Sequence, residues 1–179
     1  MVNGLGASLI ALPLLASAWV VLALRRARPS TVHLVALTAT GLTALCALAL
    51  LPHTGDGPAI AVEWLPGAGS MGLTTGATGL YAVLVTAWVA FLALLGVTSG
   101  SAECPPLSAA VTLLALAATN VAFLTDHFLA RYVALEIVAL CIALAPLVEV
   151  RNSAGIRLAW RGYLLLRLGD AGLLTAILI

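Results

Sequence analysis

The feature that most constrains the fold is an apolar stretch of forty-two residues, from Leu107 to Val148, in which only three residues are charged. About twenty apolar residues in a helix already cross the hydrocarbon core of a bilayer. The stretch is therefore twice as long as one span and has to fold back on itself. Asp126 and His127 supply its polar turn, so we expect one membrane helix at about 107–124 and another at about 128–148.

The composition of the whole chain agrees with a membrane location. Hydrophobic residues make up 63% of the 179 residues, charged residues make up 8%, and the mean hydropathy is +1.15. A soluble domain cannot cover its surface with so few polar side chains, so we expect the lipid bilayer to be the main surrounding. The net charge of +1 gives no basic field that would attract a nucleic acid, and no such partner is expected.

Four further apolar runs complete the expected architecture, at about 5–24, 32–51, 79–97 and 162–179. A Gly/Pro-rich loop at 53–69 separates the second run from the third. Pro105 and Pro106 separate the third run from the fourth, because proline stops a helix from running through. The sequence predicts an all-α membrane protein, with a single transmembrane domain over residues 1–179 and a bundle of about six helices.

The arginines predict the orientation of this bundle. All eight basic residues are arginines, and six of them lie in the connections at 25–28 and 151–161. Positive charge is retained in the cytoplasm, so these two connections are expected inside and the N-terminus outside. The lysine-free, Ala/Leu/Arg-rich composition is typical of a GC-rich bacterial genome. We therefore expect a multi-pass protein of the bacterial inner (cell) membrane.

Glu136 is the residue from which a function can be argued. It lies about eight residues into the expected fifth helix. A charged side chain at the centre of a bilayer costs about 3 kcal/mol on insertion scales, so such an acid normally faces a protein interior or a water-filled path and has a partner. A partner that moves would let Glu136 take up and release a proton. The alternative is a structural acid that stays paired with an arginine.

Other charged residues lie close to Glu136 in the expected bundle. Arg167 and Asp170 are three apart on the sixth helix, so they share a face and can pair locally or set the charge state of Glu136. We assign Glu136, Arg167 and Asp170 to a proton relay. Arg131 is expected to reach the outer interface, with tuning of Glu136 as the alternative. Arg161 is a second candidate for charge tuning.

The remaining polar residues predict no catalytic site. Asn120, the one amide in the fourth run, is expected to bond across to a neighbouring helix. The cysteines and histidines show neither a disulfide framework nor zinc spacing: Cys46, Cys104, Cys141, His33, His53 and His127. No nucleophile–base pair, haem motif or redox motif is found. We expect no cofactor and no metal in this chain, and any chemistry is assigned to partner subunits.

Two segments resemble the antiporter-like membrane subunits. The first contains Asn120-Val121, Asp126-His127-Phe128-Leu129 and Leu135-Glu136-Ile137-Val138-Ala139-Leu140-Cys141, and is similar to the family's fifth-helix segment W-E-L-x-x-L-C without the tryptophan. The second is Arg161-Gly162-Tyr163-Leu164-Leu165-Leu166-Arg167-Leu168-Gly169-Asp170. It is similar to the family's sixth-helix motif K-A-F-x-x-N-R-x-G-D, with Arg167, Gly169 and Asp170 in register.

The resemblance implies the N-terminal part of a larger antiporter-like unit. The superfamily includes the largest proton-pumping subunit of respiratory complex I, the large subunit of Mrp-type Na+/H+ antiporters and the membrane subunit of DAB-type inorganic-carbon uptake complexes. By this resemblance, Glu136 is the fifth-helix glutamate that modulates a membrane-embedded lysine on the next helix but one. The implied partners are other membrane and soluble subunits of a complex, one of which supplies the later antiporter helices.

The sequence also departs from the family pattern. Arg161 and Leu166 replace the lysine and asparagine of the sixth-helix motif, and the aspartate of a D-G-L-S-like pattern has no counterpart at 71–80. The family's seventh helix and central lysine would follow Ile179. Three functions stay open: a proton-translocating subunit of a complex I-like (NADH:quinone oxidoreductase-type) complex, a membrane subunit of a DAB-type bicarbonate or CO2 uptake complex driven by proton flux, and a structural or assembly subunit that transports nothing.

Overall fold

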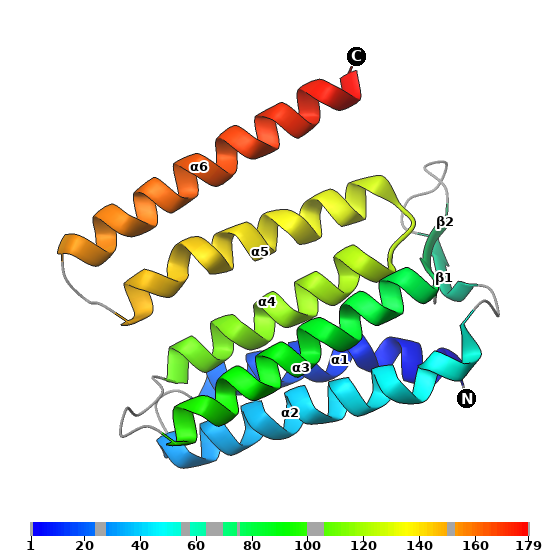
Figure 1. Ribbon diagram of the computed structural model, residues 1–179, viewed down its shortest axis with the longest axis horizontal. Helices are drawn as coiled ribbons and strands as arrows, with labels where there is room; N and C mark the ends of the chain where they lie inside the picture. The colour runs from blue at the N-terminus through cyan, green and yellow to red at the C-terminus, as the bar shows by residue number, and fades with distance from the viewer. Residues whose placement is uncertain are drawn as a thin grey trace.

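The structure, a computed structural model, describes residues 2–23, 28–54, 58–63, 70–74, 76–99, 106–149 and 153–178. Six long helices make up most of it (Figure 1): α1 Val2–Ala23, α2 Pro29–Leu50, α3 Ala77–Ser99, α4 Pro106–Leu124, α5 Phe128–Glu149 and α6 Ser153–Leu178. A short 3-10 turn, η1 Leu51–His53, follows α2. The prediction of an all-α membrane protein built as a helical bundle is confirmed.

Five of these helices are long and apolar enough to cross a bilayer: Leu5–Ala23, Pro29–His53, Ala77–Gly96, Pro106–Leu124 and Phe128–Val148. Helix α6 does not meet the same criterion, because every eighteen-residue stretch of it contains more than two charged residues. Among the described helices, α6 therefore has the most charged residues. Its charged residues have to be satisfied by protein or by the membrane interface.

Helix α6 also begins earlier than the sequence predicted. We expected the sixth helix at about 162–179 and a loop before it that holds Arg157 and Arg161. Both arginines instead lie on α6, which starts at Ser153, and both are exposed. Arginine is a strong helix former and no proline interrupts this stretch, so charge alone does not end the helix. Arg151 lies outside the described residues.

A β-hairpin replaces part of the loop that was expected at 53–69. Strand β1, Pro58–Glu63, pairs antiparallel with strand β2, Ser70–Thr74, and an irregularity in the register lies between Pro58 and Ile60. Ile60 and Val62 alternate with smaller residues, and they pair with Leu73 and Met71. This period of two is the strand signal. It was missed because the glycines and prolines around it indicated a loop.

Successive helices run in opposite directions along the bundle (Figure 1). Helices α1, α3 and α5 finish at one end of the bundle, where α2, α4 and α6 begin, and the hairpin and the turn between α4 and α5 lie at the other end. Arg28 and Arg157 are therefore near the same end, and Arg161 lies further along α6. This is the arrangement that the arginine distribution favours, and the assignment of that end to the cytoplasm stays a prediction.

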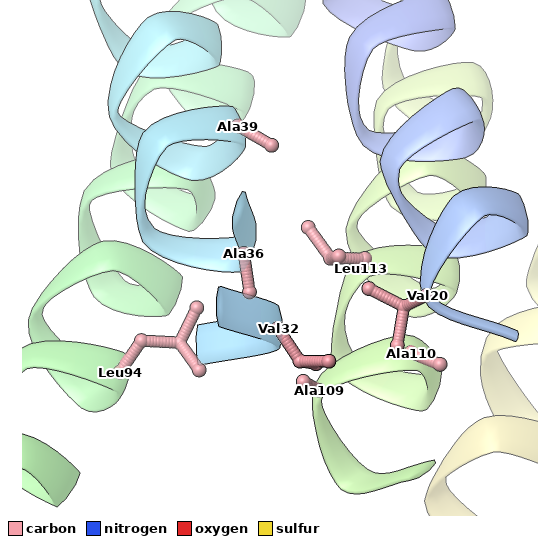
Figure 2. Close-up of a cluster of buried hydrophobic side chains, with 8 residues drawn as sticks. All are labelled: Val20, Val32, Ala36, Ala39, Leu94, Ala109, Ala110 and Leu113. Atoms are coloured by element: carbon pink, nitrogen blue, oxygen red, sulfur yellow. The ribbon is translucent and has the colours of Figure 1, made fainter. Parts of the chain in front are cut away.

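The core lies between the first four helices. Figure 2 shows one cluster of buried side chains from α1, α2, α3 and α4: Val20, Val32, Ala36, Ala39, Leu94, Ala109, Ala110 and Leu113. Half of these residues are alanines, which allow helices to approach closely where lipid provides no hydrophobic driving force. Helix α5 packs on α4, and α6 lies along α5 at the edge of the bundle (Figure 1).

Candidate functional site

The structure brings Glu136 of α5 and Arg167 of α6 together. Arg167 Nη1 lies 2.5 Å from Glu136 Oε2, which makes a salt bridge between the two helices. Glu136 is eight residues after the start of α5, so it lies about 12 Å along a helix that rises 1.5 Å per residue. The ion pair therefore lies well inside the span and not at its end.

Tyr163 orients the guanidinium of Arg167. Arg167 Nε donates a hydrogen bond of 3.0 Å to the Tyr163 hydroxyl, and the guanidinium carbon lies 5.1 Å from the centre of the ring. The two residues are four apart on α6, which places them on one face. Trp160 meets Tyr163 edge to face, with ring centres 6.1 Å apart. Sequence reasoning missed Tyr163, although its spacing of four from Arg167 was a usable signal.

The two partners of the ion pair differ in exposure. The side chain of Glu136 is 15% exposed and that of Arg167 is 40% exposed. Glu136 Oε1 is buried and has no hydrogen-bond partner among the described residues. One carboxylate oxygen is thus held by the cation, and the other makes no hydrogen bond to a described residue. A buried polar atom without a partner is rare enough to need an explanation.

Arg131 does not take part in this pair. Its Nε donates to the carbonyl oxygen of Ala122 at 3.1 Å, and its Nη2 donates to that of Thr125 at 2.7 Å. Carbonyls at the C-terminal end of a helix lack helical partners, so Arg131 caps the end of α4. Tuning of Glu136 by the charge of Arg131, the alternative from the sequence, stays a prediction. The guanidinium is bound to backbone at the end of the bundle.

The other two predicted residues lie on α6. Arg161 is exposed and lies six residues before Arg167, about 9 Å along the helix axis. The salt bridge of Glu136 is made with Arg167. Asp170 belongs to α6, but its side chain lies outside the part that the structure describes, and so does the predicted local pair between Asp170 and Arg167.

Helices α1 and α4 are joined by a different kind of polar contact. Pro13 lies inside α1 and has no N–H group, so the carbonyl of Leu9 loses its normal helical partner. The side chain of Asn120 on α4 donates to this carbonyl, with Nδ2 2.7 Å from the Leu9 oxygen. Asn120 is fully buried. The expected bond from Asn120 to a neighbouring helix therefore supplies the Leu9 carbonyl with the hydrogen-bond donor that Pro13 lacks.

The turn between α4 and α5 is held to the hairpin. Asp126 Oδ1 accepts a hydrogen bond of 3.1 Å from the Gly72 N–H, and the Asp126 N–H donates to the Gly72 carbonyl at 3.3 Å. A Cβ atom on Gly72 would lie 2.9 Å from Asp126 Oδ2, so a larger residue there would displace the Asp126 carboxylate. This contact fixes the end of the bundle at which α5 begins, and with it the direction in which α5 carries Glu136.

In the described part of the chain, no group of three histidine, cysteine, aspartate or glutamate residues is placed to hold a metal ion. The absence of a cofactor stays an expectation from the sequence.

No protein-family model and no curated protein sequence matches this chain. Among solved structures, the chain resembles one chain of the membrane-bound sulfane sulfur reductase, an archaeal respiratory membrane complex, with 22% sequence identity and a TM-score of 0.78. The match covers 95% of this chain and 35% of that chain. The chain described here is thus a multi-pass membrane protein, and it has the fold of a segment of a subunit from a respiratory membrane complex.

Proposed function

We propose that this chain is the N-terminal part of an antiporter-like subunit that translocates protons within a multi-subunit complex of a bacterial cell membrane. The observation that carries the proposal is the salt bridge between Glu136 and Arg167, inside the membrane and between two different helices. The motifs around both residues resemble those of antiporter-like subunits. The fold similarity to a subunit of a respiratory membrane complex supports the same class.

The pair works as a proton relay when the distance between the Arg167 guanidinium and the Glu136 carboxylate changes. While the guanidinium of Arg167 stays beside Glu136, the salt bridge neutralises the carboxylate. When Arg167 moves away, a proton is the remaining means of neutralising an acid in a medium of low dielectric constant. The free oxygen of Glu136, Oε1, is the atom that receives it. Arg167 and Asp170, three residues apart on α6, are assigned to tune the charge of Glu136.

The exposed face of α6 is an argument for a partner subunit or further helices that pack against it. Its large apolar residues are exposed: Leu158, Trp160, Leu164, Leu165 and Leu168. This chain spans 35% of the length of the chain that it resembles, which carries many further residues. We propose that later helices, from a longer chain or another membrane subunit, pack against α6 and supply the lysine or second acid that completes the relay. Soluble subunits or a proton gradient would supply the energy.

A structural role is the second candidate, and one observation favours it. Arg167 is held by the Tyr163 hydroxyl as well as by Glu136, and a cation with two fixed partners is a stable anchor. In that case the pair holds α5 and α6 in register and never exchanges a proton. The two functions differ in what happens when both charges are removed together.

The test measures proton flux in proteoliposomes that contain the intact complex, purified through a tag on this chain. The variants are Glu136→Gln and the double variant Glu136→Gln/Arg167→Gln, which removes both charges of the salt bridge. Arg157→Gln is the control, because Arg157 is an exposed arginine on the same helix. A relay predicts that both variants assemble and lose flux by at least about a hundredfold, the usual scale for loss of a proton-transfer group. Arg157→Gln keeps its flux.

The double variant decides between the two candidates. Normal flux through an assembled Glu136→Gln/Arg167→Gln complex would overturn the relay and leave the structural role. A second result would also overturn the relay: Glu136→Gln fails to assemble, and the double variant assembles and has normal flux. The pair would then be needed only to hold α5 and α6 together.

A further inference from the structure

A cavity lies at the opposite end of α5 from the arginine-bearing connections. It has a volume of about 380 Å³ and is lined by residues from α3, α4 and α5: Thr78, Gly79, Ala82, Ala122, Phe123, Arg131 and Leu135. At this end of the bundle α3 begins, α4 ends and α5 begins. The backbones are closely packed there, because a Cβ atom on Gly79 would lie 2.6 Å from the carbonyl oxygen of Phe123.

Arg131 brings a positive charge into this cavity with a fixed orientation. A guanidinium has five N–H donors, and the carbonyls of Ala122 and Thr125 use two of them, so three remain. The salt bridge in the described part of the chain joins Glu136 to Arg167, and no carboxylate there lies within 4 Å of Arg131. Asp126, which lies five residues before Arg131, accepts instead from the Gly72 N–H.

The lining residues are ordered by depth. Thr78 lies in the first turn of α3 and Arg131 in the first turn of α5, so both are at the level of the membrane interface. Ala82 and Leu135 lie four residues further along the same helices, about one helical turn deeper. The cavity is therefore polar and cationic at the interface and apolar below it. This is the order of groups in a phospholipid.

We propose that this cavity binds the phosphate group of a membrane phospholipid. The free N–H groups of Arg131 donate to the phosphate oxygens, a pairing in which the planar guanidinium can form two parallel bonds. The Thr78 hydroxyl donates a further hydrogen bond. One acyl chain lies along Ala82 and Leu135. The site is separate from the Glu136–Arg167 pair, and neither proposal depends on the other.

Native mass spectrometry of the complex, released from a mild detergent, tests this site with phosphatidylglycerol as the added lipid. The two test variants are Arg131→Gln, which removes the charge, and Ala82→Leu, which fills the apolar part and leaves the bonds of Arg131 intact. Arg157→Gln is the matched control, an exposed arginine at the other end of the bundle. We expect the wild type and the control to retain one tightly bound lipid. Each test variant should bind it at least about tenfold more weakly, Arg131→Gln because a charge-assisted contact is lost and Ala82→Leu because the space for the acyl chain is filled.

Inorganic phosphate, added without lipid, separates the two sources of the same chemical group. We expect it not to bind at millimolar concentration, because the apolar half of the site then stays empty. Binding of inorganic phosphate as tightly as phosphatidylglycerol would overturn the assignment to lipid. Equal retention of lipid by the wild type, Ala82→Leu and Arg131→Gln would overturn the site itself. If Arg131→Gln does not fold, Ala82→Leu decides alone.

Discussion

Two pairs of helices in this molecule are joined by polar groups inside the membrane, and the two joints differ in kind. Between α1 and α4 the groups are neutral: the Asn120 amide donates to the Leu9 carbonyl, and the Ser17 hydroxyl donates to the Ala110 carbonyl at 2.9 Å. Between α5 and α6 the groups are the charged side chains of Glu136 and Arg167. An amide or hydroxyl stays in one protonation state, whereas a carboxylate has two.

Helices α4 and α5, one from each pair, also differ in how much of the membrane span is buried. Half of the membrane span in α4 is buried inside the bundle, compared with 22% of the span in α5. Helix α6 lies against α5 at the edge (Figure 1). Regions with few packed neighbours are the ones that move at low cost in free energy. The comparison teaches that neutral bonds join α1 to the most buried helix, α4, and that the ionisable pair joins two helices at the edge of the described bundle.

Removing one charge of the ion pair is expected to have the largest effect on stability. Glu136→Gln removes the carboxylate that pairs with Arg167, whose guanidinium cannot lose its proton, at a cost of up to about 3 kcal/mol. Arg167→Gln costs less, because Glu136 can be neutralised by a proton. The double variant recovers most of the loss. Thermal unfolding in detergent, followed by circular dichroism, measures all three, and equal losses in the two single variants would contradict this asymmetry.

Asn120→Leu is expected to have the next largest effect. It leaves the Leu9 carbonyl without a partner in the bundle interior, at a cost of about 1–3 kcal/mol. The background variant Pro13→Ala restores an N–H group to α1, so the same Asn120→Leu change should cost clearly less there. A double-mutant cycle measures this coupling. Additive losses would show that Asn120 does not compensate for Pro13.

Ser17→Ala is expected to have the smallest effect. The Ala110 carbonyl that accepts from Ser17 lies within α4, so it keeps a helical partner when the hydroxyl is removed. We expect a loss of about 0.6 kcal/mol, typical of a hydrogen bond between membrane helices. The control is Ser8→Ala, whose hydroxyl bonds to Leu5 within the same helix. A loss from Ser17→Ala as large as that from Asn120→Leu would contradict the ranking of the two contacts.

Much of the fold could be predicted from the sequence, because apolar runs of about twenty residues have few alternatives to a membrane helix. The errors lie where two signals compete. Arg157 and Arg161 indicated a loop, although arginine also favours a helix. Strand β1 was hidden among glycines and prolines, which indicate turns.

The site could be predicted only in part. Glu136 was found because an acid in an apolar run is rare, but its partner depends on how α5 and α6 are rotated about their axes. Helices that are apolar all round give no face from which such a rotation can be read. For the same reason the bond from Asn120 to Leu9, residues 111 apart in the chain, could not be assigned to its acceptor.

The most direct test of the central claim asks whether Glu136 takes up a proton in the assembled complex. Infrared difference spectroscopy on acidification detects the C=O stretch of a protonated carboxyl group. We predict a band that is present in the wild type, lost in Glu136→Gln, and retained in Asp126→Asn, whose acid lies at the end of the bundle beside Gly72. A carboxyl band that is the same in the wild type and in Glu136→Gln would show that Glu136 stays ionised beside Arg167, and would contradict the relay.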